Sequence, residues 1–159
     1  MRLDETLAQV RVCAFRSYGK VPEDLVGYVK AAAREVWGLF GRHEAQLLVV
    51  ARGRLSMLIP SVENDADMKA LAQLIALVRL EFPEQQLALI VEAWLGRRMD
   101  PLPREDPERE EGLLVSYYRG AHSEVWVAKI SGPKRELGQW VKADQAVVRL
   151  FATGVDGRH

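Results

Sequence analysis

The stretch LALIVEAWLGRRMDPLPREDPEREEGLLVSY, residues 87–117, decides the fold of this chain. It opens with an apolar run, residues 87–91, that places hydrophobic side chains on both sides of an extended strand. Such a run predicts a central strand that is covered on both faces. A segment rich in prolines and charges follows over residues 96–111, and a second strand-like run opens at Leu113. The expected centre of the structure is therefore the strand that begins this stretch, followed by a long loop and a second strand.

The flanking sequence predicts the elements around this centre. Apolar residues recur at helical spacing over residues 22–40 and 64–82. Asn64 or Asp65 is a suitable N-cap for the second of these helices, and Pro83 ends it. A weaker helical pattern covers residues 4–17. Extended runs are predicted at residues 46–51, 54–60, 113–118, 124–130, 140–141 and 147–152.

Turn residues connect these runs as hairpins. Arg52-Gly53 separates two runs at the spacing of a two-residue hairpin, and residues 119–122 join another pair. We therefore expect an α+β fold, in which a largely antiparallel mixed sheet is packed by two to three helices in a single layer. The helix between Pro60 and Gln85 is a candidate crossover that would create one parallel strand pair. The expected organisation is one domain over residues 1–153 with a flexible tail over 154–159.

Composition limits the classes of function. Of the 159 residues, 48% are hydrophobic, which suffices for a sizeable core. Lys plus Arg and Asp plus Glu number 22 each, so no net charge attracts nucleic acid or an anionic membrane. Apolar runs are far shorter than the ~20 residues that span a bilayer, and one cysteine cannot form an intrachain disulfide. We expect a cytoplasmic protein without a membrane partner, and we do not expect nucleic acid as its partner.

Glu92 is the first candidate for a functional residue because it ends the central apolar run. A carboxylate buried without a partner is costly. One interpretation is a structural ion pair with Arg97, Arg98 or Arg109, of which we favour Arg109. The other is a catalytic base or metal ligand acting with carboxylates of the following loop.

Known catalytic patterns do not support the catalytic interpretation. The sequence lacks the phosphate-binding loop, the dinucleotide-binding glycine pattern and the serine nucleophile elbow. Three scattered histidines, His43, His122 and His159, do not have the spacing of a zinc site. We therefore predict neither a cofactor nor a metal, and the sequence leaves open whether the chain is an enzyme.

Aromatic residues gather in the C-terminal half. Tyr117, Trp126 and Trp140 lie on predicted strands, and tyrosine and tryptophan are enriched at protein interfaces. Core packing is the role that we expect for most of these aromatic residues. We treat these three residues as candidate interface positions.

One motif resembles a known family. The segment Ile90-Val91-Glu92-Ala93-Trp94, followed by a proline-rich loop and Asp106-Pro107-Glu108-Arg109-Glu110-Glu111, is similar to a family of small bacterial and phage proteins with no assigned activity. The similarity covers a third to a half of the chain. It implies that Glu92 and Arg109 belong to one structural unit, and it implies no mechanism.

The leading hypothesis is a non-enzymatic protein-interaction domain, with a protein partner or a second copy of itself. The alternative is a small metal-dependent hydrolase or nuclease that uses Glu92 and the loop carboxylates. It requires Glu92 to meet at least two of a set of acidic residues: Asp100, Asp106, Glu108, Glu110 and Glu111.

Overall fold

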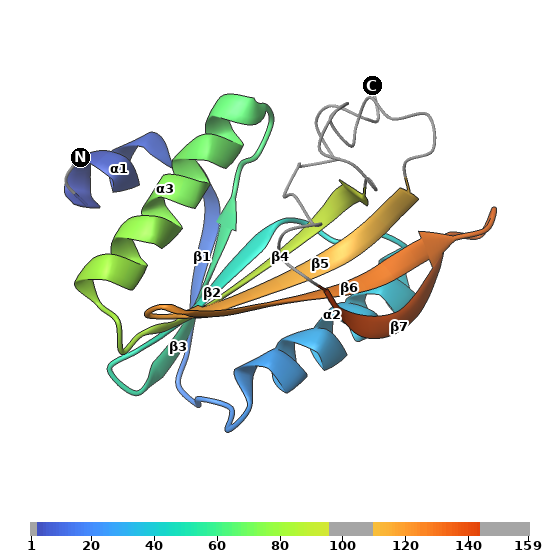
Figure 1. Ribbon diagram of the computed structural model, residues 1–159, viewed down its shortest axis with the longest axis horizontal. Helices are drawn as coiled ribbons and strands as arrows, with labels where there is room; N and C mark the ends of the chain where they lie inside the picture. Colours follow the sequence, from blue (N-terminus) through green and yellow to red (C-terminus); the bar gives the residue numbers. More distant parts are fainter. Residues whose placement is uncertain (1–2, 96–109, 144–159) are drawn as a thin grey trace.

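Seven strands form one sheet in the computed structural model, which describes residues 3–95 and 110–143 (Figure 1). The strand order is β1-β3-β2-β4-β5-β6-β7, and every neighbouring pair is antiparallel. The elements are α1 (Leu3–Gln9), β1 (Val12–Tyr18), α2 (Leu25–Phe40), β2 (Gln46–Ala51), β3 (Arg54–Pro60), α3 (Asp65–Glu81), β4 (Gln86–Leu95), β5 (Glu110–Arg119), β6 (His122–Ser131) and β7 (Glu136–Ala143). The α+β class and the antiparallel sheet predicted from the sequence are confirmed.

Helices cover both faces of the sheet, so the expected single layer of helices is wrong. Figure 1 shows α2 on one side of the strands and α1 with α3 on the other. The central strand β4 explains this arrangement, because its side chains alternate between two separate cores. Ala88 and Ile90 pack with α2, whereas Leu87, Leu89 and Val91 pack with α3. Both faces of β4 are apolar, so each face requires its own cover.

The helices begin where the sequence supplies caps. Asn64 accepts a hydrogen bond from the backbone N–H of Asp67 at 2.8 Å, as predicted for the start of α3. Asp24 accepts one from Gly27 at 3.1 Å, so α2 begins at Leu25 rather than at residue 22. Gly41, with φ of 65°, ends α2 in the left-handed conformation that suits glycine.

The predicted hairpins form as expected. Arg52 and Gly53, with φ of 53° and 71°, make the tight turn between β2 and β3. Gly120, with φ of 56°, opens the turn between β5 and β6. The connection from β3 through α3 to β4 passes over β2, so β3 and β4 run parallel without being neighbours. The expected parallel pair is therefore not present among the described strands.

The helix predicted over residues 4–17 is wrong in its second half. The chain leaves α1 after Gln9 and forms β1, which pairs with β3. The guanidinium of Arg11 forms ion pairs with Glu63, at 3.2 Å, and with Asp67. This pairing lowers the pKa of the Asp67 carboxyl. Strand pairing and this ion pair are long-range interactions, and they outweigh a weak local helical pattern.

Three further sequence expectations concern the C-terminal part of the chain. Strand β7 extends the predicted short strand at residues 140–141, whereas the strand predicted at 147–152 and the tail at 154–159 lie outside the described residues. None of the helices described is both long enough and apolar enough to cross a membrane.

Candidate functional site

Glu92 lies near the end of β4 with its side chain 11% exposed, and its partner is an arginine that the sequence did not suggest. The guanidinium of Arg135, in the turn between β6 and β7, donates to the Glu92 carboxylate at 2.8 Å. The backbone N–H of His43 donates to the other carboxylate oxygen at 3.2 Å. The expectation that Glu92 has a charged partner is therefore met by a residue 43 positions away.

Several contacts hold Arg135 in place. The indole N–H of Trp37 donates to the Arg135 carbonyl oxygen at 2.8 Å, and the guanidinium lies 5.5 Å from the centre of the Trp37 ring. The same guanidinium contacts the carboxylate of Glu111 at 3.3 Å. Arg135 has a φ of 52°, a conformation that is unfavourable for a residue with a Cβ. These contacts join α2, β4, β5 and the turn into one unit.

His43 completes this polar cluster. Its side chain is buried, and its Nδ1 lies 2.6 Å from the carbonyl oxygen of Glu44. Burial lowers the pKa of His43, because the charged imidazole is poorly solvated there, although the Glu44 carbonyl and the Glu92 carboxylate act in the opposite direction. The neutral ring is therefore favoured in the folded protein near neutral pH.

The alternative function, a metal-dependent hydrolase or nuclease, requires Glu92 and other carboxylates to lie close together. Glu92 and Glu111 converge on the guanidinium of Arg135, and Glu110 pairs with Lys129 at 3.0 Å. Over residues 3–95 and 110–143, no group of three or more His, Cys, Asp or Glu side chains has the arrangement to hold a metal ion. The other acidic candidates and the predicted partner Arg109 lie outside the described residues.

The candidate interface aromatics all lie on the face that carries α2. Tyr117 is buried and donates its hydroxyl to Gln86 at 2.8 Å, and burial raises its pKa. Trp126 and Trp140 are partly buried against the same core. The Lys30 ammonium lies 3.6 Å from the centre of the Trp126 ring, a cation–π contact between α2 and β6. These contacts show core packing, and an interface role for the three aromatics stays a prediction.

A second polar site lies on the same face, where α2 leaves part of the sheet uncovered. We call it the arginine groove, a hollow of about 310 Å³. Its lining residues come from α2, the connection to β2, and strands β1, β2 and β3: Arg16, Val36, Phe40, Arg42, Glu44, Gln46, Met57 and Ile59.

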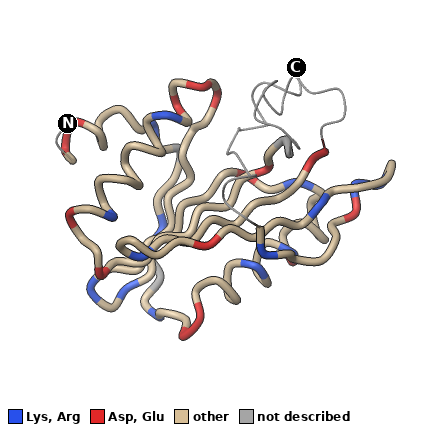
Figure 2. The backbone as a smooth tube through the Cα atoms, in the orientation of Figure 1, with Lys and Arg blue, Asp and Glu red and all other residues tan. Residues whose placement is uncertain are grey.

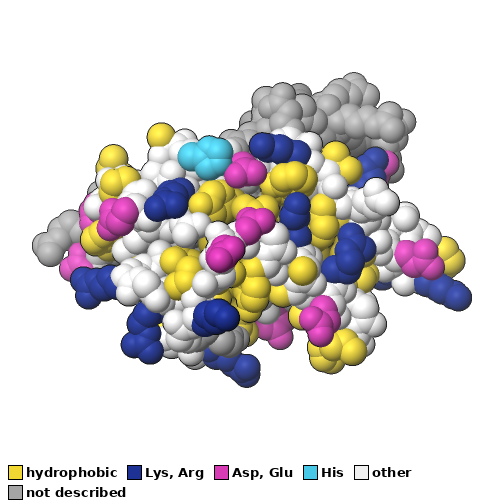
Figure 3. All heavy atoms as spheres, turned by 90° about the horizontal axis from the view of Figure 1, so that it is seen from below, with side chains coloured by type: hydrophobic (Ala, Val, Ile, Leu, Met, Phe, Trp, Pro, Cys, Tyr) yellow, Lys and Arg dark blue, Asp and Glu magenta, His cyan; other side chains and the backbone are white. Residues whose placement is uncertain are grey.

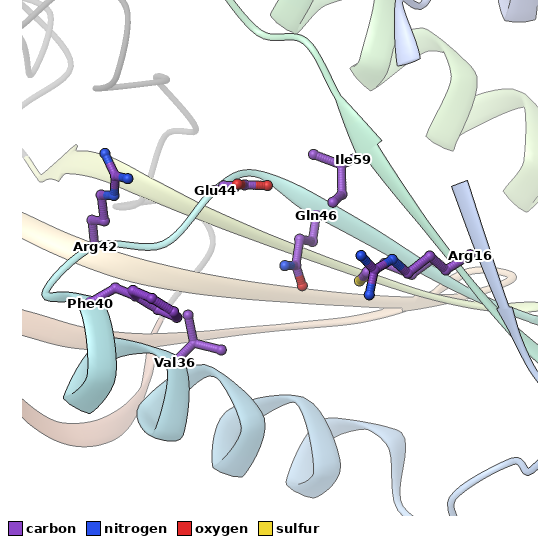
Figure 4. A pocket seen from close by; sticks show the side chains of 8 residues that line it. Arg16, Val36, Phe40, Arg42, Glu44, Gln46 and Ile59 are labelled. Atoms are coloured by element: carbon purple, nitrogen blue, oxygen red, sulfur yellow. The ribbon is translucent and has the colours of Figure 1, made fainter. Parts of the chain in front are cut away.

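Figure 4 shows the arrangement of the arginine groove. Arg16 extends from β1 over the sheet toward Gln46, while Val36 and Phe40 rise from α2 on the opposite side. The apolar part is open to solvent, because the side chain of Phe40 is 67% exposed. Figure 3 shows apolar atoms at the surface between charged side chains on the side of the molecule that carries α2. The groove thus combines accessible apolar surface with positive charge.

The charges in the arginine groove are unbalanced. In the part of the chain that the structure describes, no carboxylate forms an ion pair with Arg16 or Arg42. Glu44 supplies one negative charge against these two arginines. Elsewhere basic and acidic residues are spread over the chain (Figure 2), and the arginine of the polar cluster, Arg135, is paired with Glu92 and Glu111. The arginine groove therefore has a local positive excess in a chain of zero net charge.

The sequence did not identify this groove. The sequence predicts Arg16 in a helix, and Arg42 follows a helix end without any spacing that marks a site. The two arginines come together because β1 pairs with β3 beside the end of α2. Comparison with models of known families, with curated proteins and with solved structures found no match. The resemblance to a bacterial and phage family therefore stays a prediction.

Proposed function

We propose that this chain is a protein-interaction domain that binds an acidic segment of a partner protein in the arginine groove. The observation that carries the proposal is that Arg16 and Arg42 have no carboxylate partner among the described residues and lie beside the exposed side chain of Phe40. Arginine binds carboxylates through paired hydrogen bonds and is enriched, with aromatic residues, at interfaces. A segment that alternates carboxylates with bulky apolar residues fits both properties of the groove.

The polar cluster at Glu92 serves the fold in this proposal. Its carboxylate receives hydrogen bonds from Arg135 and His43, so two of its acceptor positions are occupied. An enzyme built on Glu92 would have to displace Arg135, which also binds Glu111. No described contact favours the metal-dependent hydrolase over the interaction domain.

The test is a selection from a random peptide library with the full chain as bait, followed by binding measurements by fluorescence anisotropy. The expected peptides combine Asp or Glu with Leu, Phe or another bulky apolar residue. The variant Arg42→Glu should weaken their binding by about tenfold or more, which corresponds to ~1.4 kcal/mol. Salt should weaken binding to the wild type, because the arginines are exposed.

Arg54→Glu is the matched control, since Arg54 is exposed on β3 and its replacement changes the net charge equally. This variant should bind the selected peptides like the wild type. Selected peptides without acidic residues, or equal losses in the two variants, would show that the groove is not the binding site.

A further inference from the structure

Strand β1 is an unpaired edge of the sheet. Within the described part of the chain, β3 is the one strand that pairs with it. An edge strand leaves a row of backbone N–H and C=O groups available to another strand. Two of its apolar side chains are also exposed, since Val12 is 42% and Phe15 is 61% accessible to solvent. Among the residues that the structure describes, nothing therefore pairs with the outer backbone edge of β1 or covers Val12 and Phe15 fully.

The register with β3 assigns the side chains of β1 to the two faces. Phe15 lies opposite Leu58, which packs on the α3 side, so Phe15 is on that face. Arg16 lies opposite Met57 on the α2 side. The β1 strand is irregular between Val12 and Ala14 and regular from there to Tyr18. The regular part thus presents an exposed aromatic on one face and a single charge on the other.

The protections found at other sheet edges are few here. Strand β1 contains no proline and no lysine, two residue types that discourage pairing at an edge; its irregularity lies at its start, between Val12 and Ala14, and Arg16 is its one charged residue. The opposite edge, β7, carries Glu136 and Lys142. The difference between the two edges makes β1 the edge that is suited to a further strand.

We propose that two copies of this chain pair through β1 in antiparallel orientation, with the two-fold axis at Phe15. The axis of such a pair is perpendicular to the sheet, so opposed residues lie on the same face. Phe15 then faces Phe15 of the second copy, and the two exposed rings cover each other. The two seven-stranded sheets become continuous across the interface.

The charge of Arg16 and the irregular start of β1 favour an axis at Phe15 over an axis at either neighbouring residue. An axis at Arg16 would place two guanidinium groups directly opposite each other, which is unfavourable. An axis at Ala14 would draw the irregular stretch next to Val12 into the centre of both strands. An axis at Phe15 places Arg16 opposite Ala14 and keeps the regular residues at the centre.

The dimer goes beyond the proposed binding of an acidic segment, because its partner is a second copy of this chain. Its contacts are the backbone edge of β1 and Phe15, whereas Arg16 of the same strand lines the groove on the other face of the sheet. The two-fold axis keeps the α2 faces of both copies on the same side of the continuous sheet, so two arginine grooves would face one direction. A partner with two acidic segments would engage both copies at once. The dimer and the groove can be disrupted separately, since Phe15 and Arg42 lie on different elements.

The first test is sedimentation of the full chain at several micromolar concentrations. The wild type should show a species with twice the monomer mass of 17.9 kDa. Phe15→Glu places two carboxylates opposite each other and should give a monomer. Leu80→Glu is the control, because Leu80 is 78% exposed on α3, and it should remain a dimer. A monomeric wild type, an assembly larger than a dimer, or a dimer that persists in Phe15→Glu overturns the proposal.

The second test reads the register by disulfide cross-linking in a Cys13→Ser background. Opposed residues of antiparallel strands have Cα atoms about 4.5–5.5 Å apart, within the range that a disulfide spans. Phe15→Cys should therefore cross-link to the second copy under mild oxidation. Arg16→Cys should not, because its copies are diagonal neighbours at about 7–8 Å. Cross-linking of Arg16→Cys without Phe15→Cys overturns the register, and circular dichroism establishes that both variants are folded.

Discussion

The ion pair between Glu92 and Arg135 allows a quantitative test of how the polar cluster stabilises the fold. The perturbation is Arg135→Met, which removes the guanidinium, keeps most of the apolar stem and leaves the backbone conformation equally unfavourable. Glu92 then loses a hydrogen bond of 2.8 Å and keeps the one from the His43 backbone. The variant therefore measures how much the guanidinium contributes to the free energy of unfolding, separately from the conformation of the turn.

The expected loss lies between two limits. Removing one partner of a fully buried ion pair costs ~3–5 kcal/mol, and an exposed pair contributes ~0–1 kcal/mol. Glu92 is 11% exposed and Arg135 is 34% exposed, so solvent screens the pair from one side. We expect about 2–3 kcal/mol from this intermediate burial, equivalent to roughly 5–10 °C in Tm for a chain of this size.

Lys129→Met, on strand β6, is the matched control. The Lys129–Glu110 pair is similarly short at 3.0 Å, but its side chains are 66% and 45% exposed. Its removal should cost less than ~1 kcal/mol. Both experiments replace a long cationic side chain by methionine; they differ in burial and in the second carboxylate, Glu111, that Arg135 also contacts.

The assay is urea unfolding followed by tryptophan fluorescence, applied to Glu92→Gln, Arg135→Met and the double variant. The double-mutant cycle should give a coupling of about 1–2 kcal/mol. Equal losses in Arg135→Met and Lys129→Met, or a coupling of zero, would refute the reasoning. The sequence suggested Arg109 as the partner of Glu92; if that pair also forms, Arg109→Ala should lower stability more than Arg104→Ala, and equal melting temperatures would refute it.

Three further predictions follow from local geometry. Burial lowers the pKa of His43, so below pH ~6.5 the unfolded chain binds a proton more readily than the folded chain. Stability should therefore fall by up to ~1.4 kcal/mol for each unit by which the pH is lowered. His43→Gln should reduce this pH dependence in unfolding measured from pH 7 to pH 5. Asn64→Ala should cost ~1 kcal/mol and Asn64→Gly only a few tenths, because glycine is a tolerated N-cap. Gly120→Ala should cost ~1–3 kcal/mol in thermal unfolding, since φ is 56° and the new Cβ would lie 3.1 Å from the Pro83 carbonyl oxygen. Gly19→Ala is the control: its new Cβ would meet no atom within 4 Å, so its stability should be close to that of the wild type.

Local signals explain which elements the sequence could predict. The β2–β3 hairpin depends on Arg52 and Gly53, which adopt positive φ within the turn itself. Helix α3 depends on Asn64, whose side chain bonds to a residue three positions away. Each of these features is determined by residues that are close in sequence, so its pattern is visible without the fold.

Long-range contacts explain what the sequence could not predict. The segment that became β1 contains Ala14 and Phe15 at spacings that also suit a helix face. Pairing with β3 decides in favour of a strand, and that pairing joins residues 37 to 48 positions apart. The partner of Glu92 was missed for the same reason, because Arg135 reaches it through a turn that packs on Trp37.

The misassigned segment is also the one on which both proposals depend. A helix over residues 4–17 would have no free edge and would place Arg16 away from the strands that line the groove. As a strand, the same residues expose Phe15 at the sheet edge and bring Arg16 beside Met57 and Ile59. A surface that binds another chain carries backbone and side-chain groups whose partners lie on that other chain. Its sequence therefore agrees less well with the isolated fold, and its secondary structure is harder to predict from sequence. The contrast between the predictable α3 and the unpredicted β1 is therefore expected if β1 is held in place by partners as well as by its own sheet.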